Sequence, residues 1–132
     1  MGIFQEHKLN KIIKKSVDAT LLQIENDSPR IFKHCYYGAF WVSPGSLVIW
    51  YIFKTDAEWE EAKENGLTNQ LKLLTFHNLM SFGYPLMAIP SKFIPENKRD
   101  KESSRGKKVF VAFTSDEDVQ NKAGGDYHVY FN

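Results

Sequence analysis

Apolar residues recur with a helical period near the start of the chain. They fall at intervals of three and four residues: Leu9, Ile12, Ile13, Val17, Leu21 and Ile24. Lysines occupy the opposite side, so the pattern predicts a long amphipathic helix with one buried stripe. Residues 26–29 are expected to end this helix, because Pro29 disfavours helical backbone in the residue before it.

Residues 30–53 have the composition of two paired strands. The segment 30–42 is rich in aromatic and β-branched residues, 43–46 has turn composition, and 47–53 is apolar at every position. A strand with two apolar faces is usually central and covered on both sides. We therefore expect the 30–53 hairpin at the centre of a sheet, with its second face covered by a helix, a loop or a partner such as a second copy of the chain.

Two helices are predicted next. Thr55 and Glu58 have capping-box spacing and begin a short acidic helix that ends near Gly66. A second helix is expected over 68–82. Three prolines limit the segment 86–95 to an edge strand or an extended loop, and the charged segment of about 96–108 is expected to be an exposed loop.

The remaining segments predict two strands around one more helix. Residues 109–113 have strand composition, and 114–118 cap a short helix that ends at two glycines. Apolar and polar residues alternate over 126–131, which predicts a last strand. Residues 53–58 and 113–118 share the order of strand, cap and acidic first turn, which capping chemistry alone explains. The whole pattern predicts one α+β domain over 1–132, with a long N-terminal helix packed on a mainly antiparallel sheet of four or five strands.

Composition adds little to this picture. Apolar residues make up 42% and charged residues 25% of the 132 positions, both typical of a globular domain. The formal net charge is +1, so no overall field attracts nucleic acid or an acidic membrane. There is no signal peptide pattern and no apolar run long enough to span a bilayer, and Cys35 has no second cysteine to pair with. These features predict a cytoplasmic protein that is not bound to membrane.

The titratable residues form no recognised catalytic or metal-binding motif. The four histidines His7, His34, His77 and His128 are scattered, and no two have the spacing of a helical zinc motif. Cys35 lies in an apolar segment and is expected to be a small buried thiol. We therefore predict no cofactor, no metal and no catalytic residues, and the sequence favours a protein that is not an enzyme.

Charge segregation favours protein recognition. Acidic residues concentrate in 56–64, and basic residues in 8–15 and 92–108. Separate patches of opposite sign suit protein–protein complementarity, so we predict binding residues Trp59, Glu58 and Glu61, with Trp59 as a candidate anchor. In size, patch charge and lack of catalytic motifs the chain is similar to immunity proteins, which neutralise partner toxins. This resemblance implies an immunity-type inhibitor, although no residue motif carries it.

Two other hypotheses remain open. A small-molecule-binding domain or minor enzyme would use a pocket between helix and sheet. We predict the lining of that pocket as Tyr36, Tyr37, Trp50, His77 and His128. Nucleic-acid binding through the basic loop is a weaker hypothesis, because a loop of mixed charge is usually a solvated loop.

Overall fold

The computed structural model describes residues 2–99 and 106–131, with side chains from residue 4 onward. In that part of the chain the helices are α1 (Gly2–Gln23), α2 (Asp56–Glu64), α3 (Leu67–Ser81), α4 (Asp116–Ala123) and α5 (Tyr127–Phe131). The strands are β1 (Lys33–Tyr37), β2 (Val48–Phe53) and β3 (Phe110–Ser115). Short 3-10 turns span Pro44–Ser46, Leu86–Ala88, Ser91–Phe93 and Glu96–Lys98.

The described strands form a mixed sheet in the order β1-β2-β3. β1 pairs antiparallel with β2, but β2 pairs parallel with β3, in register from Val48 opposite Phe110 to Phe53 opposite Ser115. The prediction of an α+β fold is confirmed, whereas the prediction of four or five mainly antiparallel strands is wrong. The 30–53 hairpin forms, with β2 central and β1 at an edge, but β1 ends at Tyr37, and the segment 38–47 replaces the short turn expected at 43–46.

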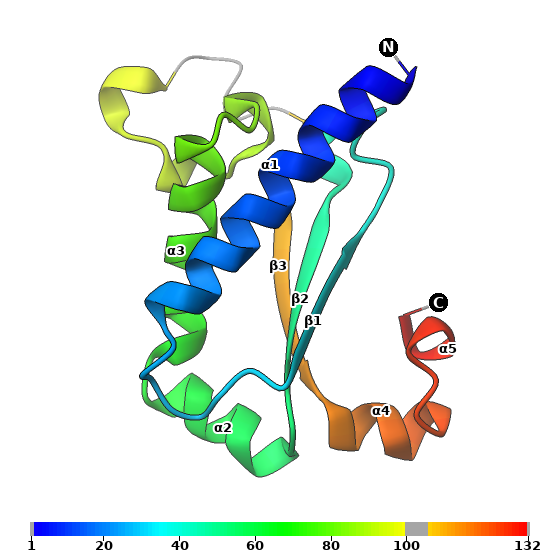
Figure 1. The fold of residues 1–132 in the computed structure, drawn as a ribbon. Helices are drawn as coiled ribbons and strands as arrows, with labels where there is room; N and C mark the ends of the chain where they lie inside the picture. The colour runs from blue at the N-terminus through cyan, green and yellow to red at the C-terminus, as the bar shows by residue number, and fades with distance from the viewer. Residues whose placement is uncertain (1, 100–105, 132) are drawn as a thin grey trace.

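The first face of the sheet is covered by α1 and α3, which lie side by side on it (Figure 1). Alternate residues of β2 point to this side: Ile49, Tyr51 and Phe53 are at most 1% exposed. The buried Tyr51 hydroxyl hydrogen-bonds the Thr75 hydroxyl of α3 at 2.7 Å. The predicted burial of the apolar stripe of the N-terminal helix is confirmed, because Leu9, Ile13 and Val17 belong to this core.

The second face is covered by α4 and α5, which lie on the side of the sheet away from α1 (Figure 1). The cover is incomplete. Ile52 and Thr114 are buried, but the row formed by Tyr37, Val48 and Phe110 at the other end of the face is open. Tyr37 is 40% exposed and Phe110 is 61% exposed. We call these three residues the open row.

Residues 126–131 were predicted to be a strand and instead form α5 with its cap. The Asp126 carboxylate accepts a hydrogen bond from the Val129 amide at 3.1 Å, and the Asp126 carbonyl accepts one from the Tyr130 amide at 3.0 Å. Six residues are too few to separate a period of two from a helical period. The aromatic residues at 127, 130 and 131 also fit helical spacing. The Asp126 side chain caps the first turn and so favours the helix over a strand.

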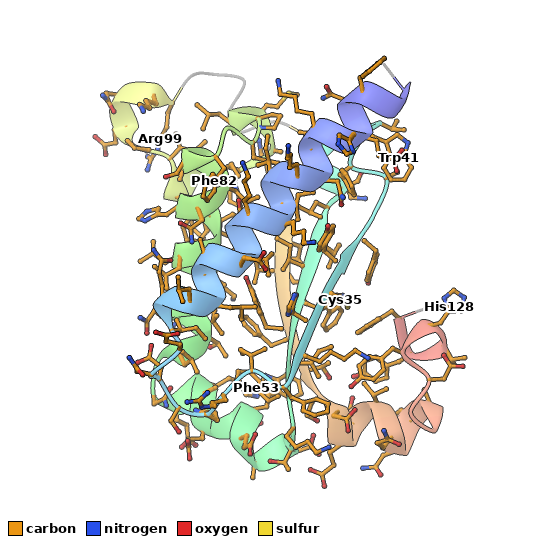
Figure 2. All side chains as sticks on the ribbon, in the orientation of Figure 1. Cys35, Trp41, Phe53, Phe82, Arg99 and His128 are labelled. Carbon is orange, nitrogen blue, oxygen red and sulfur yellow. The ribbon has the colours of Figure 1, made fainter. Side chains whose placement is uncertain are left out.

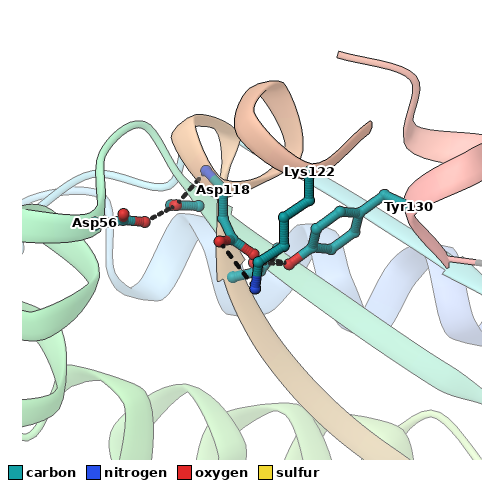
Figure 3. A network of polar contacts seen from close by, with 6 residues as sticks. Asp56, Asp118, Lys122 and Tyr130 are labelled. Carbon is teal, nitrogen blue, oxygen red and sulfur yellow. Dashed lines mark hydrogen bonds and ion pairs between the residues drawn. The ribbon is translucent and has the colours of Figure 1, made fainter. Parts of the chain in front are cut away.

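The parallel strands β2 and β3 end at the same edge of the sheet, and each leads directly into a capped helix. The Thr55 hydroxyl accepts from the Glu58 amide at 3.1 Å, and the Ser115 hydroxyl accepts from the Asp118 amide at 3.0 Å. Ser115 also donates to the Asp56 carboxylate at the start of α2 (Figure 3). The two helix starts are therefore joined through one buried hydroxyl.

This joint predicts unequal costs for removing the two caps. We expect Thr55→Ala to lower the free energy of unfolding by about 1 kcal/mol, a usual value for one lost cap. Ser115→Ala should lower it by about 2 kcal/mol, because it removes the cap of α4 and leaves the Asp56 carboxylate without its donor. Urea denaturation of both variants measures the difference. Equal costs would show that the Ser115–Asp56 hydrogen bond contributes nothing.

Candidate functional site

A groove of about 630 Å³ lies between the segment 28–32 and α2. Its lining comprises Ser28, Pro29, Arg30, Ile31, Phe32, Lys54, Glu58 and Glu61. We call it the acidic groove, because Glu58 and Glu61 stand about one turn apart on α2 and face it together. Both were predicted as binding residues, and the structure brings these two together.

The carboxylates of the acidic groove are not ion-paired. Within the described residues neither Glu58 nor Glu61 forms an ion pair, although two cations, Arg30 and Lys54, line the same groove. The Lys54 ammonium lies 3.6 Å from the Asp116 carboxylate and 4.2 Å from the centroid of the Phe32 ring. Phe32 itself is 49% exposed. The groove thus offers two carboxylates that have no ion-pair partner among the described residues, beside an exposed aromatic ring and two cations, Arg30 and Lys54.

Trp59, the predicted anchor, lies on α2 but does not line the acidic groove. Its ring is half-buried and packs against the hydrophobic core. The Lys63 ammonium lies 4.6 Å from the ring centroid and also pairs with Glu60 at 2.7 Å. An anchoring role for Trp59 stays a prediction, and it would need a partner that displaces Lys63.

A second pocket, of about 500 Å³, lies between β1 and α5. We call it the aromatic pocket, and its lining comprises Lys33, Cys35, Tyr37, Tyr127, His128 and Phe131. The first three share one face of β1, because alternate residues of a strand point to the same side. The other three come from α5. Figure 2 shows Cys35 and His128 on the side of the sheet away from α1.

Trp50 of β2 fixes the position of two rings of the aromatic pocket. The Phe131 ring stacks on the Trp50 ring with centroids 4.6 Å apart, and the Trp50 indole N–H donates to the Tyr37 hydroxyl at 3.0 Å. Both contacts join rings on the second face of the sheet. The pocket wall is therefore tied to the central strand rather than to a loop.

Two tyrosine–carboxylate hydrogen bonds hold α5 against α4. The Tyr127 hydroxyl donates to Asp116. The Tyr130 hydroxyl donates to Asp118, which also pairs with Lys122 at 3.3 Å (Figure 3). The bond from Tyr127, helped by Lys54, lowers the pKa of the Asp116 carboxyl. The bond from Tyr130, helped by Lys122, likewise lowers the pKa of the Asp118 carboxyl.

Cys35 is half-buried at the back of the aromatic pocket. Burial raises the pKa of its thiol, and the positive charge of Lys33 opposes this rise only in part. The thiol is therefore protonated at neutral pH and is a weak nucleophile. This agrees with the expectation of an inert thiol, although Cys35 is less buried than predicted.

The pocket predicted from the sequence does not assemble as a whole. Tyr37, Trp50 and His128 do lie together, at the aromatic pocket. Tyr36 points to the opposite face of the sheet, where its hydroxyl donates to Asn10 of α1. His77 is on α3 and lines a separate pocket of about 610 Å³ with Tyr84, Phe93 and Lys98 among its neighbours.

The histidines do not form a metal site in the described part of the chain. His34 lies on β1 opposite Tyr51, on the other face of the sheet from the aromatic pocket that His128 lines. Over residues 2–99 and 106–131 no group of three or more histidine, cysteine or carboxylate side chains could hold a metal ion. The predicted basic loop of 96–108 falls partly outside the described residues, so its nucleic-acid role stays a prediction.

Sequence reasoning missed Lys33, Tyr127 and Phe131 as pocket residues. Because residues 126–131 were predicted to be a strand of the sheet, their rings were not expected to form a wall over its second face. The signal that could have found them was Asp126 directly before three rings at helical spacing.

The fold and the two pockets define an α+β protein with a three-stranded mixed sheet and surface sites at the start of α2 and beneath α5. Comparisons with protein-family models, with curated proteins and with solved structures gave no match to this chain. None of the helices over the described ranges is both long enough and apolar enough to cross a membrane.

The lowered pKa of Asp116 gives a pH-dependent stability. A carboxyl whose pKa is lower in the folded protein stabilises it above the ordinary value near 3.8, and this stabilisation is lost as the pH falls through the folded pKa. We expect Tyr127→Phe to lower the free energy of unfolding at about pH 7. Between about pH 4 and about pH 2 the free energy of unfolding of this variant should decrease less than that of the unsubstituted protein. Urea denaturation over this range measures both effects.

Tyr84→Phe is the matched control. Its hydroxyl donates to the Pro44 carbonyl, which does not titrate, so this variant should lose the same stability at each pH of the series. A pH dependence of Tyr127→Phe that equals that of the unsubstituted protein would contradict the role of the Tyr127–Asp116 bond.

Proposed function

We propose that this protein is a non-enzymatic protein-binding module that recognises a basic segment of a partner protein through the acidic groove. The observation that carries the proposal is the pair of carboxylates, Glu58 and Glu61, which line a groove beside the exposed Phe32 ring and have no ion-pair partner among the described residues. A partner cation would supply the ion pair that Arg30 and Lys54, which line the same groove, do not form with them.

The side chain that best fits the acidic groove is arginine. Its planar guanidinium pairs with carboxylates through several N–H donors and also stacks on aromatic rings. In the groove the N–H groups of a guanidinium would donate to Glu58 or Glu61, and its plane would stack on the Phe32 ring. The Lys54 ammonium already lies over Phe32, so a partner arginine would compete with it for the ring but not for the two carboxylates.

One more carboxylate lies at the same end of α2. Glu117 of α4 is exposed and accepts a hydrogen bond from the Asp56 amide at the start of α2. Acidic groups on a surface speed the encounter with a basic partner and discriminate against acidic ones. They support a recognition role without any catalytic group.

An immunity-type inhibitor is the specific form of this proposal. Such a protein acts by covering the working surface of its partner, which requires a complementary surface and no chemistry of its own. Cytoplasmic location belongs to the same proposal, since a lone thiol at Cys35 suits a reducing compartment.

The test compares two charge-neutralising pairs on the same helix. Glu58→Gln with Glu61→Gln removes the carboxylates of the acidic groove, whereas Glu60→Gln with Glu64→Gln removes two that do not line it. Both variants change the net charge equally. Tagged forms of each are used to capture partners from the native cell extract, and the affinity for the captured partner is then measured with purified components.

We expect the first pair to weaken binding at least tenfold, with a smaller salt dependence, because each lost contact to a charged group costs about 1.5–3 kcal/mol. The second pair should weaken it by less than about threefold, as exposed charges act mainly on the rate of encounter. Equal loss in both variants would reduce the proposal to general charge attraction. Unchanged binding by the first pair would overturn it.

A further inference from the structure

We propose that the aromatic pocket is a binding site for a small planar aromatic carboxylate. This inference goes beyond the proposed protein-binding function, because the pocket and the acidic groove have no lining residue in common. It is carried by three features of the pocket: its volume, its aromatic lining, and a lysine that has no counter-ion among the described residues.

The volume and lining fit a small ligand. Pockets that hold small molecules usually measure about 300–1,000 Å³ and are lined by apolar and aromatic groups with few polar ones. The aromatic pocket has about 500 Å³ and presents the rings of Tyr37, Tyr127 and Phe131 around Cys35. Aromatic rings prefer offset-stacked or edge-to-face neighbours, so a planar ligand with one or two fused aromatic rings fits this pocket best.

The rings are held in place before a ligand arrives. Phe131 stacks on Trp50, Tyr37 accepts a hydrogen bond from Trp50, and Tyr127 donates one to Asp116. Each wall is thus anchored to a residue outside the pocket. A site that needs no rearrangement loses less conformational entropy on binding.

The positive charge of Lys33 favours a ligand with a negative charge. The Lys33 ammonium lies 4.2 Å from the centroid of the Tyr127 ring and makes no ion pair within the described residues. The nearby Asp116 carboxylate is already engaged by the Tyr127 hydroxyl and by Lys54. A carboxylate at the rim could therefore pair with Lys33 while its ring lies among the aromatic side chains.

Binding at this site is noncovalent. Burial raises the pKa of the Cys35 thiol, so at neutral pH the sulfur is largely protonated and is only a weak nucleophile. The thiol is nevertheless useful as a reporter. It is the sole cysteine of the chain, and a ligand in the pocket would shield it.

The other pockets suit this ligand less well. The acidic groove carries Glu58 and Glu61, which repel an anion. The pocket beside His77 contains a cation, Lys98, and the rings of His77, Tyr84 and Phe93, but most of its lining is not aromatic. In the aromatic pocket, by contrast, three of the six lining residues are tyrosine or phenylalanine.

The experiment uses three probes and two variants of the full chain. The probes are 2-naphthoate, its neutral isostere 2-naphthamide, and the non-aromatic cyclohexanecarboxylate. Lys33→Met removes the proposed partner of the carboxylate. Lys63→Met is the matched control, since Lys63 also lies over an aromatic ring, that of Trp59, but lines neither pocket. Affinities come from titrations followed by ¹H–¹⁵N correlation spectra.

We expect 2-naphthoate to shift resonances of β1 and α5 saturably and to bind about two- to fivefold more tightly than the amide, the range for an exposed ion pair. Lys33→Met should abolish this preference and leave the affinity for the amide unchanged, whereas Lys63→Met should change neither. Cyclohexanecarboxylate should bind at least about threefold more weakly than 2-naphthoate, because it cannot stack.

Alkylation of Cys35 by N-ethylmaleimide gives an independent readout. Saturating 2-naphthoate should slow it at least fivefold in the unsubstituted protein. Three results would overturn the proposal: no saturable shift with 2-naphthoate, shifts confined to residues away from β1 and α5, or equal affinity for the acid and the amide. Because neither Glu58 nor Glu61 is altered, each of these failures would leave the protein-binding proposal untouched.

Discussion

The burial of β2 on both faces is the constraint on which the rest of this structure depends. Its residues are apolar without interruption, so each face needs a covering layer. The two long helices α1 and α3 bury the first-face residues of β2. The second face has only α4 and the five residues of α5, which leave the open row partly exposed and a hollow beneath α5. The aromatic pocket thus exists because the second layer is too small for the sheet it covers.

The acidic end of the molecule has a structural origin as well. Carboxylates collect at the starts of α2 and α4 because helix N-termini favour negative charge, and the parallel pairing of β2 and β3 brings both starts to one edge. Asp56, Asp116 and Asp118 are used up in hydrogen bonds that hold this edge together. Among the described residues the carboxylates of Glu58 and Glu61 make no such hydrogen bond, which leaves them free for the partner that we propose.

Local signals in the sequence predicted local structure well. The stripe of α1, the capping box at Thr55 and the apolar run of β2 each determine their own element, and each was found. The parallel pairing of β2 with β3 could not be predicted from either segment alone. The two strands share the order of strand, cap and acidic first turn, but capping chemistry explains this order without any pairing. The candidate sites followed the same division. Glu58 and Glu61 share a helix face and were correctly predicted to lie together. Tyr36 and Tyr37 are neighbours on a strand, so their side chains point to opposite faces of the sheet and cannot line one pocket.

The pairing of Val48 with Phe110 joins positions more than sixty residues apart, and this bears on how the chain acquires its fold. A contact between such distant residues forms late, since the loop between them loses much freedom before any pairing compensates. Until then one long edge of β2 carries unpaired amide and carbonyl groups on an apolar strand, which other chains can pair with. During synthesis the hairpin of β1 and β2 emerges well before β3 does. The nascent chain is therefore most exposed to misassociation in that interval, and a chaperone would have its clearest target in the bare edge of β2.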